Sequence, residues 1–537
     1  MTGIYSAHDA IIGVQSALGG RGGGLRWLLR DEFTTDRAAG AVNGTAAEPG
    51  PGTRGGTDTG NNLSHNGGKM IAAGIVTGGD PARVYDAQAR IAGKVLIAQL
   101  NITTMRGIFG WSLSATPSAA NHISIGVGDS SGVNSAIIDG AYIPISFSAA
   151  TDYKFAFIPR SAGGVILAKG GAFTNWTLLL ISANGTTATL YPALAARAVA
   201  CGFTSEFVRI PDVLWLPTPL VSDGYGSSYG VSDGRGHAEG IAGGIGAGGA
   251  GVVFSNVNDT WSTSGGKAIN TPSLGANIIV NGGFDADTDW TKGTGWSIGS
   301  GVASVTGDSG PTLSQNVLEA QKWYLAQFTV SSYVSGAVYG WFNATGRTYK
   351  QANDTFNQVM WATGATAGVR VIGTGVSLAV DDVSFREFDM SELLSISDLS
   401  CSDVYASVAI TRSDASFPVG LALNWDSDTN PANGVIVHLQ ESRVYVDKCV
   451  AGTWTNVSST IYTYSAGARL EVHKSGTEYR VYYNNALVTS QTIADAGIVS
   501  NTLHGIFSTN ASNTLDDLTI YATGTNGEYA ALDKYSS

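Results

Sequence analysis

Residues 259–301 read DTWSTSGGKAINTPSLGANIIVNGGFDADTDWTKGTGWSIGSG. Two similar motifs begin within this stretch, WSTSGGK at Trp261 and WSIGSG at Trp296, and an aromatic residue, Phe254 or Phe284, leads into each. Similar motifs of this kind indicate repeated structural units. The chain therefore starts a second unit before it has completed the first.

Related motifs occur elsewhere in the chain. A third opening lies at Phe33 and is later followed by LSHNGGK at 63–69. Three stretches resemble one another as endings: IPDVLW at 210–215, VDDVSF at 380–385 and LDDLTI at 515–520. We interpret each ending as a last strand with apolar residues inward and acidic residues that turn the chain into it.

Openings and endings do not alternate, and nesting explains their order most simply. A second large unit then begins near Gly251, is interrupted by a complete smaller unit, and resumes at Met390. An inserted domain can leave and return at one edge where the first and last strands lie side by side. The alternative is a plain series, with 221–275 as linker and 389–523 as a self-sufficient domain. Nesting predicts that the strand around Trp261 pairs with the sheet built from residues after 389.

The composition predicts an all-β fold of several antiparallel β-sandwiches, or jelly rolls, with a short N-terminal helix at 4–18. Of 537 residues, 71 are glycine, 13% are charged and 43% are hydrophobic, which suits short strands and tight turns. Expected strands include 153–158, 165–168, 468–472 and 479–483. Hairpin turns with positive φ are expected at Gly170-Gly171 and Asn484-Asn485.

The nested order gives the following expected divisions: an N-terminal helix or docking segment at 1–24, a first sandwich at 25–220, a Gly-rich linker at 221–250, a discontinuous second sandwich at 251–275 plus 389–523, an inserted jelly roll at 276–388 and a C-terminal tail at 524–537.

Three family resemblances add to this pattern. The stretch LGANIIVNGGF at 274–284, Trp296, and AVDDVSF at 379–385 resemble the ends of a jelly-roll carbohydrate-binding module. YRVYYNNALV at 479–488 and the LDDL ending make the two larger units similar to concanavalin A-like and laminin-G-like sandwiches. The whole arrangement, with DEFTTDRAAGAVNG at 31–44 and DGRGHAE at 233–239, resembles structural proteins of tailed bacteriophages, of the tail fibre, spike, head-fibre or decoration type.

Charge and motifs argue against several functions. The net charge of −12, without a basic run, argues against nucleic-acid binding. A signal peptide and a membrane-spanning run are not expected. A sandwich hydrolase needs carboxylates that face one cleft about 5–5.5 Å apart. The adjacent pairs Asp381-Asp382 and Asp516-Asp517 face opposite ways in a strand, and Asp31-Glu32 caps a turn, so we expect no enzyme.

Calcium is the one cofactor that the resemblance implies. Modules resembling 276–388 often hold a structural calcium between the opening and the last strand. Asp285 with Asp381 or Asp382 would supply hard oxygen ligands there, and surface turn carboxylates are the alternative. Cys401 and Cys449 are either a pair, if their strands are adjacent, or buried free thiols.

Sugar binding requires an exposed aromatic platform flanked by hydrogen-bonding groups. In AVYGWFN at 337–343, alternation puts Val338 and Phe342 on one face of the strand and the candidate binding residues on the other. The alternative is that these aromatics belong to the core. The predicted site comprises Tyr339, Trp341 and Asn343, with Tyr349 and Trp361 as neighbours. Trp261 and Trp296 are predicted to be core residues.

The sequence therefore predicts a non-enzymatic protein of a phage virion surface, assembled in the host cytoplasm. Expected partners are other virion proteins, further copies of the chain (a trimer by analogy with fibres) and a cell-surface glycan. Membrane insertion is not expected. The alternative is a purely structural head-fibre, decoration or tail protein without sugar binding.

Overall fold

A computed structural model describes most of the chain. The described residues are 27–35, 37, 45–57, 63–72, 82–104, 107–114, 123–130, 133–138, 141–145, 148, 150–160, 163–181, 189–196, 202–212, 214–215, 221–223, 247–248, 252–253, 260–308, 310–343, 349–523, 532 and 536. The chain divides into two compact units, 1–217 with 524–537, and 218–523. The helix predicted at 4–18 lies outside the described residues. No helix in the described segments has the length and apolar character needed to cross a membrane.

The all-β prediction is confirmed, and the first unit is a sandwich of two antiparallel sheets. Trp111 on one sheet donates from Nε1 to the carbonyl of Phe157 on the other, over 3.0 Å, so the fully buried indole joins the two layers. One sheet has the order β13 (Phe173–Ile181), β12 (Gly164–Gly170), β11 (Asp152–Pro159), β6 (Leu96–Thr104), β15 (Gly202–Pro211), β4 (Lys69–Ala72), β3 (Leu63–Asn66), with β1 (Trp27–Asp31) on β15. The other has the order β10 (Ala141–Pro144), β9 (Val133–Ile138), β8 (Ile123–Ser130), β7 (Gly107–Ser112), β14 (Tyr191–Ala196), β5 (Ala82–Tyr85), β2 (Arg54–Thr57).

The second unit contains a sandwich with the same strand order, except that none of its described strands corresponds to β2. Its first sheet runs β19 (Trp261–Ser264), β20 (Lys267–Asn270), β38 (Asn513–Ala522), β29 (Val404–Arg412), β34 (Ala468–Ser475), β35 (Glu478–Tyr483), β36 (Ala486–Thr492). Its second runs β28 (Leu394–Asp398), β37 (Leu503–Ser508), β30 (Val419–Trp425), β31 (Gly434–Gln440), β32 (Arg443–Val450), β33 (Thr453–Ile461). Position by position, β19 and β20 correspond to β3 and β4, and β28 corresponds to β5.

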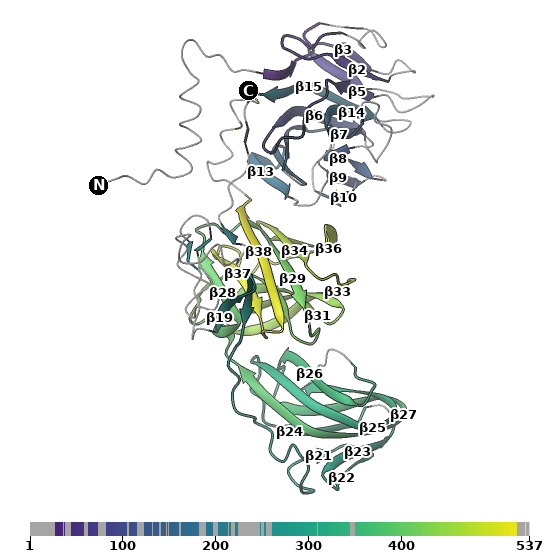
Figure 1. The fold of residues 1–537 in the computed structure, drawn as a ribbon, viewed down its shortest axis with the longest axis vertical. Coiled ribbons are helices and arrows are strands. Elements are labelled where there is room, and N and C mark those ends of the chain that lie inside the picture. The colour runs from purple at the N-terminus through teal and green to yellow at the C-terminus, as the bar shows by residue number, and fades with distance from the viewer. Residues whose placement is uncertain are drawn as a thin grey trace, which may run out of the picture. The chain divides into compact units, whose positions relative to one another are not determined.

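The strand around Trp261 pairs within the sheet built from residues after 389. Ala268 of β20 is opposite Leu515 of β38, and in Figure 1 the teal β19 lies among the green and yellow strands of this sandwich. This is the pairing that the nested order requires. The stretch predicted as a linker contributes too, because β16 (Val221–Asp223) pairs with β38. A two-stranded ribbon, β17 (Ala247–Gly248) and β18 (Val252–Val253), follows.

A jelly roll lies between β20 and β28 in the chain. Two long, bent strands, β25 (Trp323–Phe342) and β27 (Thr366–Phe388), dominate it (Figure 1). The remaining strands are β21 (Thr291–Lys292), β22 (Trp296–Gly299), β23 (Val302–Gly307), β24 (Thr312–Asn316) and β26 (Asp354–Trp361). We call residues 276–388 the inserted module. Leu274 bridges to Phe388, so the chain leaves the sandwich and returns to it at one place.

The openings are β-hairpins with two-residue turns of one type. The turn residues have φ of 58° and 73° at Gly67-Gly68, 58° and 73° at Gly265-Gly266, and 57° and 74° at Ser300-Gly301. Two successive positive φ angles are the requirement of a type I′ turn, whose twist matches that of the strands. The predicted positive φ at Gly170-Gly171 and Asn484-Asn485 is also confirmed. Trp261 and Trp296, which begin two of the hairpins, are buried as predicted.

The Asp-Asp endings form β-bulges. Asp382 and Asp517 have φ of 52° and 49°, and each donates its backbone N–H to the carboxylate of the preceding aspartate, over 2.7 Å and 2.8 Å. The strand register shifts at both places. Short polar residues tolerate the left-handed conformation because their side chains bond locally, which explains why this pair recurs. The Asp-Asp pair therefore lies within the last strand and bends it. It does not turn the chain into that strand, as the sequence had predicted.

Two further residue predictions are settled by the structure. Cys401 and Cys449 are both free, so of the two alternatives the free thiols are confirmed, and burial raises the pKa of both thiols, that of Cys449 to about 12. Asp31 does accept from the Phe33 N–H, at 3.3 Å, as a turn cap would. Its main partner is Arg54, whose Nε lies 2.7 Å from Oδ2 in a fully buried ion pair.

The inserted module and its host sandwich share an apolar core. Trp323, Val359, Trp361 and Phe388 of the module pack on the outer face of the sheet β28-β37-β30-β31-β32-β33. The sandwich side of this junction core comprises Leu393, Leu394, Ile396, Phe417, Ala422, Trp425, Ile436, Cys449, Trp454 and Phe507. Polar bonds cross the same contact: Gln440 donates to the Val359 carbonyl at 2.8 Å, and Lys350 lies 3.3 Å from Glu441.

Glu392, in the short 3₁₀ helix η5 (Met390–Leu393), ties the returning chain to the first hairpin. Its carbonyl accepts from Trp261 Nε1 at 3.1 Å and from the Asn270 amide at 2.9 Å. Its carboxylate accepts from the Ser273 N–H at 2.6 Å. Glu392 is 4% exposed, so these bonds form away from water and hold the hairpin on the resumed sandwich.

His504 makes the stability of this sandwich depend on pH. Its Nδ1 accepts from the Asn424 N–H at 3.3 Å and its Nε2 donates to the Cys401 carbonyl at 2.8 Å, which requires a neutral ring. Burial lowers its pKa from 6.5 to about 4. The folded state therefore binds fewer protons than the unfolded state below pH 6.5. We expect the free energy of unfolding to fall by about 3 kcal/mol as the pH drops from 6.5 through 4.

Urea unfolding at pH 7 and pH 4 measures this loss. Carboxylates also titrate in that range, so His504→Gln serves as the comparison, because the glutamine amide does not titrate. The variant should lose less stability than the parent over the same interval. An equal loss in both proteins would contradict the assignment to His504.

Candidate functional site

Core packing separates the two faces of β25, although burial alone does not. Val338 and Phe342 are fully buried in the core of the inserted module. Tyr339 and Trp341 lie on the opposite face of the strand, where Tyr339 is 6% exposed and Trp341 is half-buried. The predicted exposed platform is therefore only partly present on β25, because Tyr339 is buried and Trp341 alone of the two is partly exposed.

Three aromatic rings form a row on this face. The ring centroids of Tyr339 and Trp341 are 6.0 Å apart and those of Tyr339 and Tyr349 are 5.2 Å apart, both edge-on. Tyr349 is 53% exposed. We call Tyr339, Trp341 and Tyr349 the aromatic row. Edge-on packing holds the rings in place, which suits a rigid binding platform.

Arg370 completes the row, although it was not among the residues predicted from the sequence. It lies on β27 directly opposite Tyr339, and its guanidinium carbon is 4.5 Å from the Trp341 ring centroid. The cation–π contact covers one face of the indole. Burial raises the pKa of Tyr339, and the neighbouring guanidinium opposes that shift. The signal for Arg370 was its place in the alternating strand VRVI at 369–372.

Two predicted members lie away from the row. Asn343 follows the end of β25 with φ of 69°, and its amide lies 3.5 Å from Thr363 Oγ1. The alternation ends at Phe342, so the extrapolation to Asn343 is wrong. Trp361 is 7% exposed within the junction core. On β26, Met360 faces the module core and Val359 and Trp361 face the sandwich, so both sides of the strand are buried.

The predicted calcium ligands are arranged as follows. Asp285 and Asp382 are exposed, and Asp381 is half-buried. Burial, and the neighbouring Asp382 and Asp285 carboxylates, raise the pKa of Asp381. The described residues contain no group of three or more His, Cys, Asp or Glu side chains that could hold a metal. Calcium binding therefore stays a prediction.

The expectation of no enzyme also relied on the absence of a Glu-x-Asp-x-x-Glu motif, which is wrong, because EFDMSE at 387–392 has that spacing. Glu387 pairs with Lys322 at 2.9 Å, and Asp389 accepts from the Ser391 N–H at 2.9 Å as the N-cap of η5. The buried Glu392 carboxylate accepts from the Ser273 N–H. The three carboxylates occupy a strand end, a cap and a buried bond, and do not alternate along one strand.

The described architecture defines a class: an all-β protein of antiparallel sandwiches with an aromatic row on one of them. No protein-family model matches the chain, and no curated protein matches it. Among solved structures, the carbohydrate-binding module CBM66 from Bacillus subtilis is 18% identical, covers 24% of this chain and 76% of its own, and has a TM-score of 0.18. The CBM22-1-CBM22-2 tandem domain from Paenibacillus barcinonensis Xyn10C is 10% identical, with coverages of 48% and 98% and a TM-score of 0.17.

A glycoside hydrolase structure also matches: a mutant of the GH43 protein BlXynB from Bacillus licheniformis. It is 11% identical, with coverages of 84% and 97% and a TM-score of 0.19. TM-scores this low give no grounds for transferring a ligand or an activity to this chain.

Proposed function

We propose that this chain is a non-enzymatic surface protein of a tailed-bacteriophage virion that attaches to a cell-surface glycan through the aromatic row. The observation that supports glycan recognition is the row itself. Tyr349 is 53% exposed beside the edge-packed Tyr339 and Trp341, and Arg370 supplies hydrogen-bond donors at the same place. Aromatic faces bind the C–H side of a sugar ring, and the guanidinium binds its hydroxyls.

Location on a phage virion is supported by the resemblance of residues 31–44 and 233–239 to structural proteins of tailed bacteriophages. The protein would be assembled in the host cytoplasm and carried on the virion, in contact with other virion proteins. A trimer is the expected oligomer. Immunogold labelling of purified particles would test the location, and analytical ultracentrifugation the copy number.

A glycan array followed by titration calorimetry tests recognition. We expect Tyr349→Ala and Trp341→Ala each to weaken binding about 5–10-fold, because each removes a ring surface worth about 1–1.5 kcal/mol. Tyr349→Phe keeps the ring and should retain most of the affinity. Ile461→Ala, at a 69% exposed position on the host sandwich, is the surface control. Release of reducing ends from a bound oligosaccharide would contradict the non-enzymatic part of the proposal.

The alternative is a purely structural head-fibre, decoration or tail protein. The observation in its favour is the Arg370 guanidinium, which covers one face of Trp341. On this alternative, the side chains of the aromatic row and Arg370 contact one another and bind no ligand. No binding on the array, together with unchanged particle assembly for Tyr349→Ala, would support it.

A further inference from the structure

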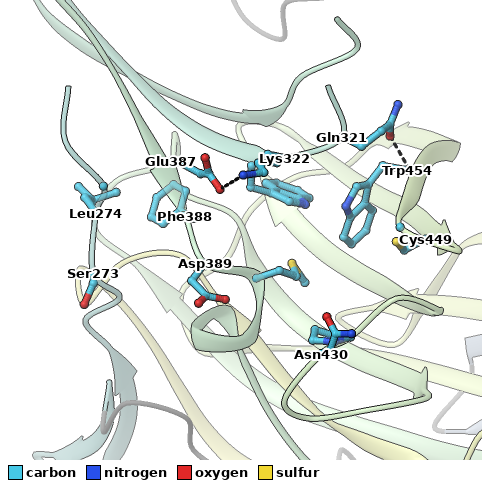
Figure 2. A pocket seen from close by; sticks show the side chains of 15 residues that line it. Ser273, Leu274, Gln321, Lys322, Glu387, Phe388, Asp389, Asn430, Cys449 and Trp454 are labelled. Carbon is cyan, nitrogen blue, oxygen red and sulfur yellow. Dashed lines mark hydrogen bonds and ion pairs between the residues drawn. The ribbon is translucent and has the colours of Figure 1, made fainter. Parts of the chain in front are cut away.

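A pocket of about 710 Å³ opens at the junction of the inserted module and its host sandwich. Its walls come from the chain leaving the sandwich, the chain returning to it, the start of β25, the β30–β31 loop and the β32–β33 hairpin. Figure 2 shows Lys322, Phe388 and Trp454 on one side of the space and Asp389 and Asn430 on the other. The volume and the mixture of aromatic walls with a few polar groups fit a small-molecule site.

The aromatic walls are fixed by the junction core. The rings of Trp323 and Trp454 meet at 86° with centroids 5.3 Å apart. The Trp454 N–H donates to Gln321 Oε1 at 2.6 Å, which joins the hairpin to the module at the edge of the pocket. The pocket is therefore built from both the inserted module and its host sandwich, and it exists only where these two parts meet.

One polar group of this wall lacks a partner. Trp323 is 1% exposed, and its Nε1 has no hydrogen-bond partner among the described residues. A buried N–H without a partner is unfavourable, because it has lost its bond to water. An acceptor that reaches this N–H would remove that cost.

The charges around the pocket disfavour an anionic ligand. The Lys322 ammonium lies 2.9 Å from Glu387 and 2.8 Å from Glu319, so its charge is already compensated. Asp389 adds a further carboxylate, which repels anions. The pocket lining offers hydrogen-bond donors and acceptors side by side. Hydroxyl groups match this pattern, because each hydroxyl both donates and accepts.

We propose that this junction pocket binds one or two rings of a neutral saccharide, separately from the aromatic row. The rings lie against Trp454 and Phe388, and their hydroxyls bond to Asp389 and Asn430. This inference rests on the proposed glycan recognition and adds a second subsite to it. The pocket lies where 276–388 meets the sandwich, so a bound ligand also bridges the two bodies.

Titration calorimetry on the full chain tests the pocket, with cellotriose, xylotriose, maltotriose, mannotriose and tri-N-acetylglucosamine as neutral probes and trigalacturonate as the acidic one. At least one neutral trisaccharide should bind, and trigalacturonate should not. Asn430→Ala should weaken binding about 3–10-fold, as expected for one hydrogen bond. Asn430→Trp should abolish it by filling the pocket. Thr429→Ala, next to it on the same loop and outside the lining, should leave the affinity unchanged.

The variants separate the two sites. Binding that survives Asn430→Trp but is lost with Trp341→Ala overturns the pocket and leaves the aromatic row. Binding lost with Asn430→Trp but retained with Trp341→Ala supports the pocket and overturns recognition through the row. Absence of binding by every neutral trisaccharide at millimolar concentration, or preferential binding of trigalacturonate, overturns the pocket proposal. Circular dichroism and thermal unfolding confirm that each variant is folded, and Asn430 is exposed, so its replacement leaves the core intact.

Discussion

Trp261→Ala is expected to destabilise the sandwich formed by residues after 389 by about 3–5 kcal/mol. Trp261 is fully buried, and its ring packs in the same core as Leu421, Val437 and Leu515. Its indole N–H also bonds to the Glu392 carbonyl. Replacement leaves a cavity and removes one donor from a carbonyl far along the chain from the mutated residue.

Hydrogen exchange followed by mass spectrometry locates the effect. In Trp261→Ala, exchange should rise in β29, β30, β37 and β38. Trp296→Ala is the matched control, because Trp296 begins the same type of hairpin but packs in the module core. Its effect should appear in β23 and β27. If Trp261→Ala changed exchange only within 276–388, the strand would belong to the module and the pairing described above would be wrong.

Trp361→Ala is expected to cost about 3–5 kcal/mol as well, and to uncouple the inserted module from its host. The indole is 7% exposed between the two bodies. Calorimetry of the parent should show the module and the sandwich unfolding in one cooperative step. The variant should show two, because the packing that links them is lost.

Trp341→Ala provides the control for this experiment. It removes a tryptophan of the same module from a half-buried position outside the junction core, so it should leave a single transition. Two transitions in the parent, or a loss of sugar binding without loss of stability in Trp361→Ala, would contradict the placement of Trp361 in the junction core.

Most of the architecture was predictable because it rests on local chemistry. The paired glycines at 67–68 and 265–266 have to adopt positive φ, and Trp261 begins a motif that the first sandwich repeats at Leu63. These features need no long-range information. The Asp-Asp pairs were recognised as recurrent but misinterpreted, because a β-bulge depends on the strand register, which the sequence does not contain.

The candidate site was predictable only in part. Alternation correctly separated Tyr339 and Trp341 from Val338 and Phe342. It failed for Trp361, since a strand buried on both sides shows the same residues as one with an exposed aromatic face. Arg370 and the junction pocket were missed because both arise from segments that meet only after folding. EFDMSE at 387–392 was visible in the sequence and was overlooked.

The position of the insertion also determines the order of assembly during synthesis. Ala268 of β20 pairs with Leu515 of β38. At about 5–20 residues per second, the ribosome needs on the order of 10–50 s to make the chain between them. During that interval the β19–β20 hairpin has an open edge, which invites pairing with other chains. The inserted module is complete well before β38 emerges, so its Trp323 and Trp361 surface is available as a template on which the host sandwich closes.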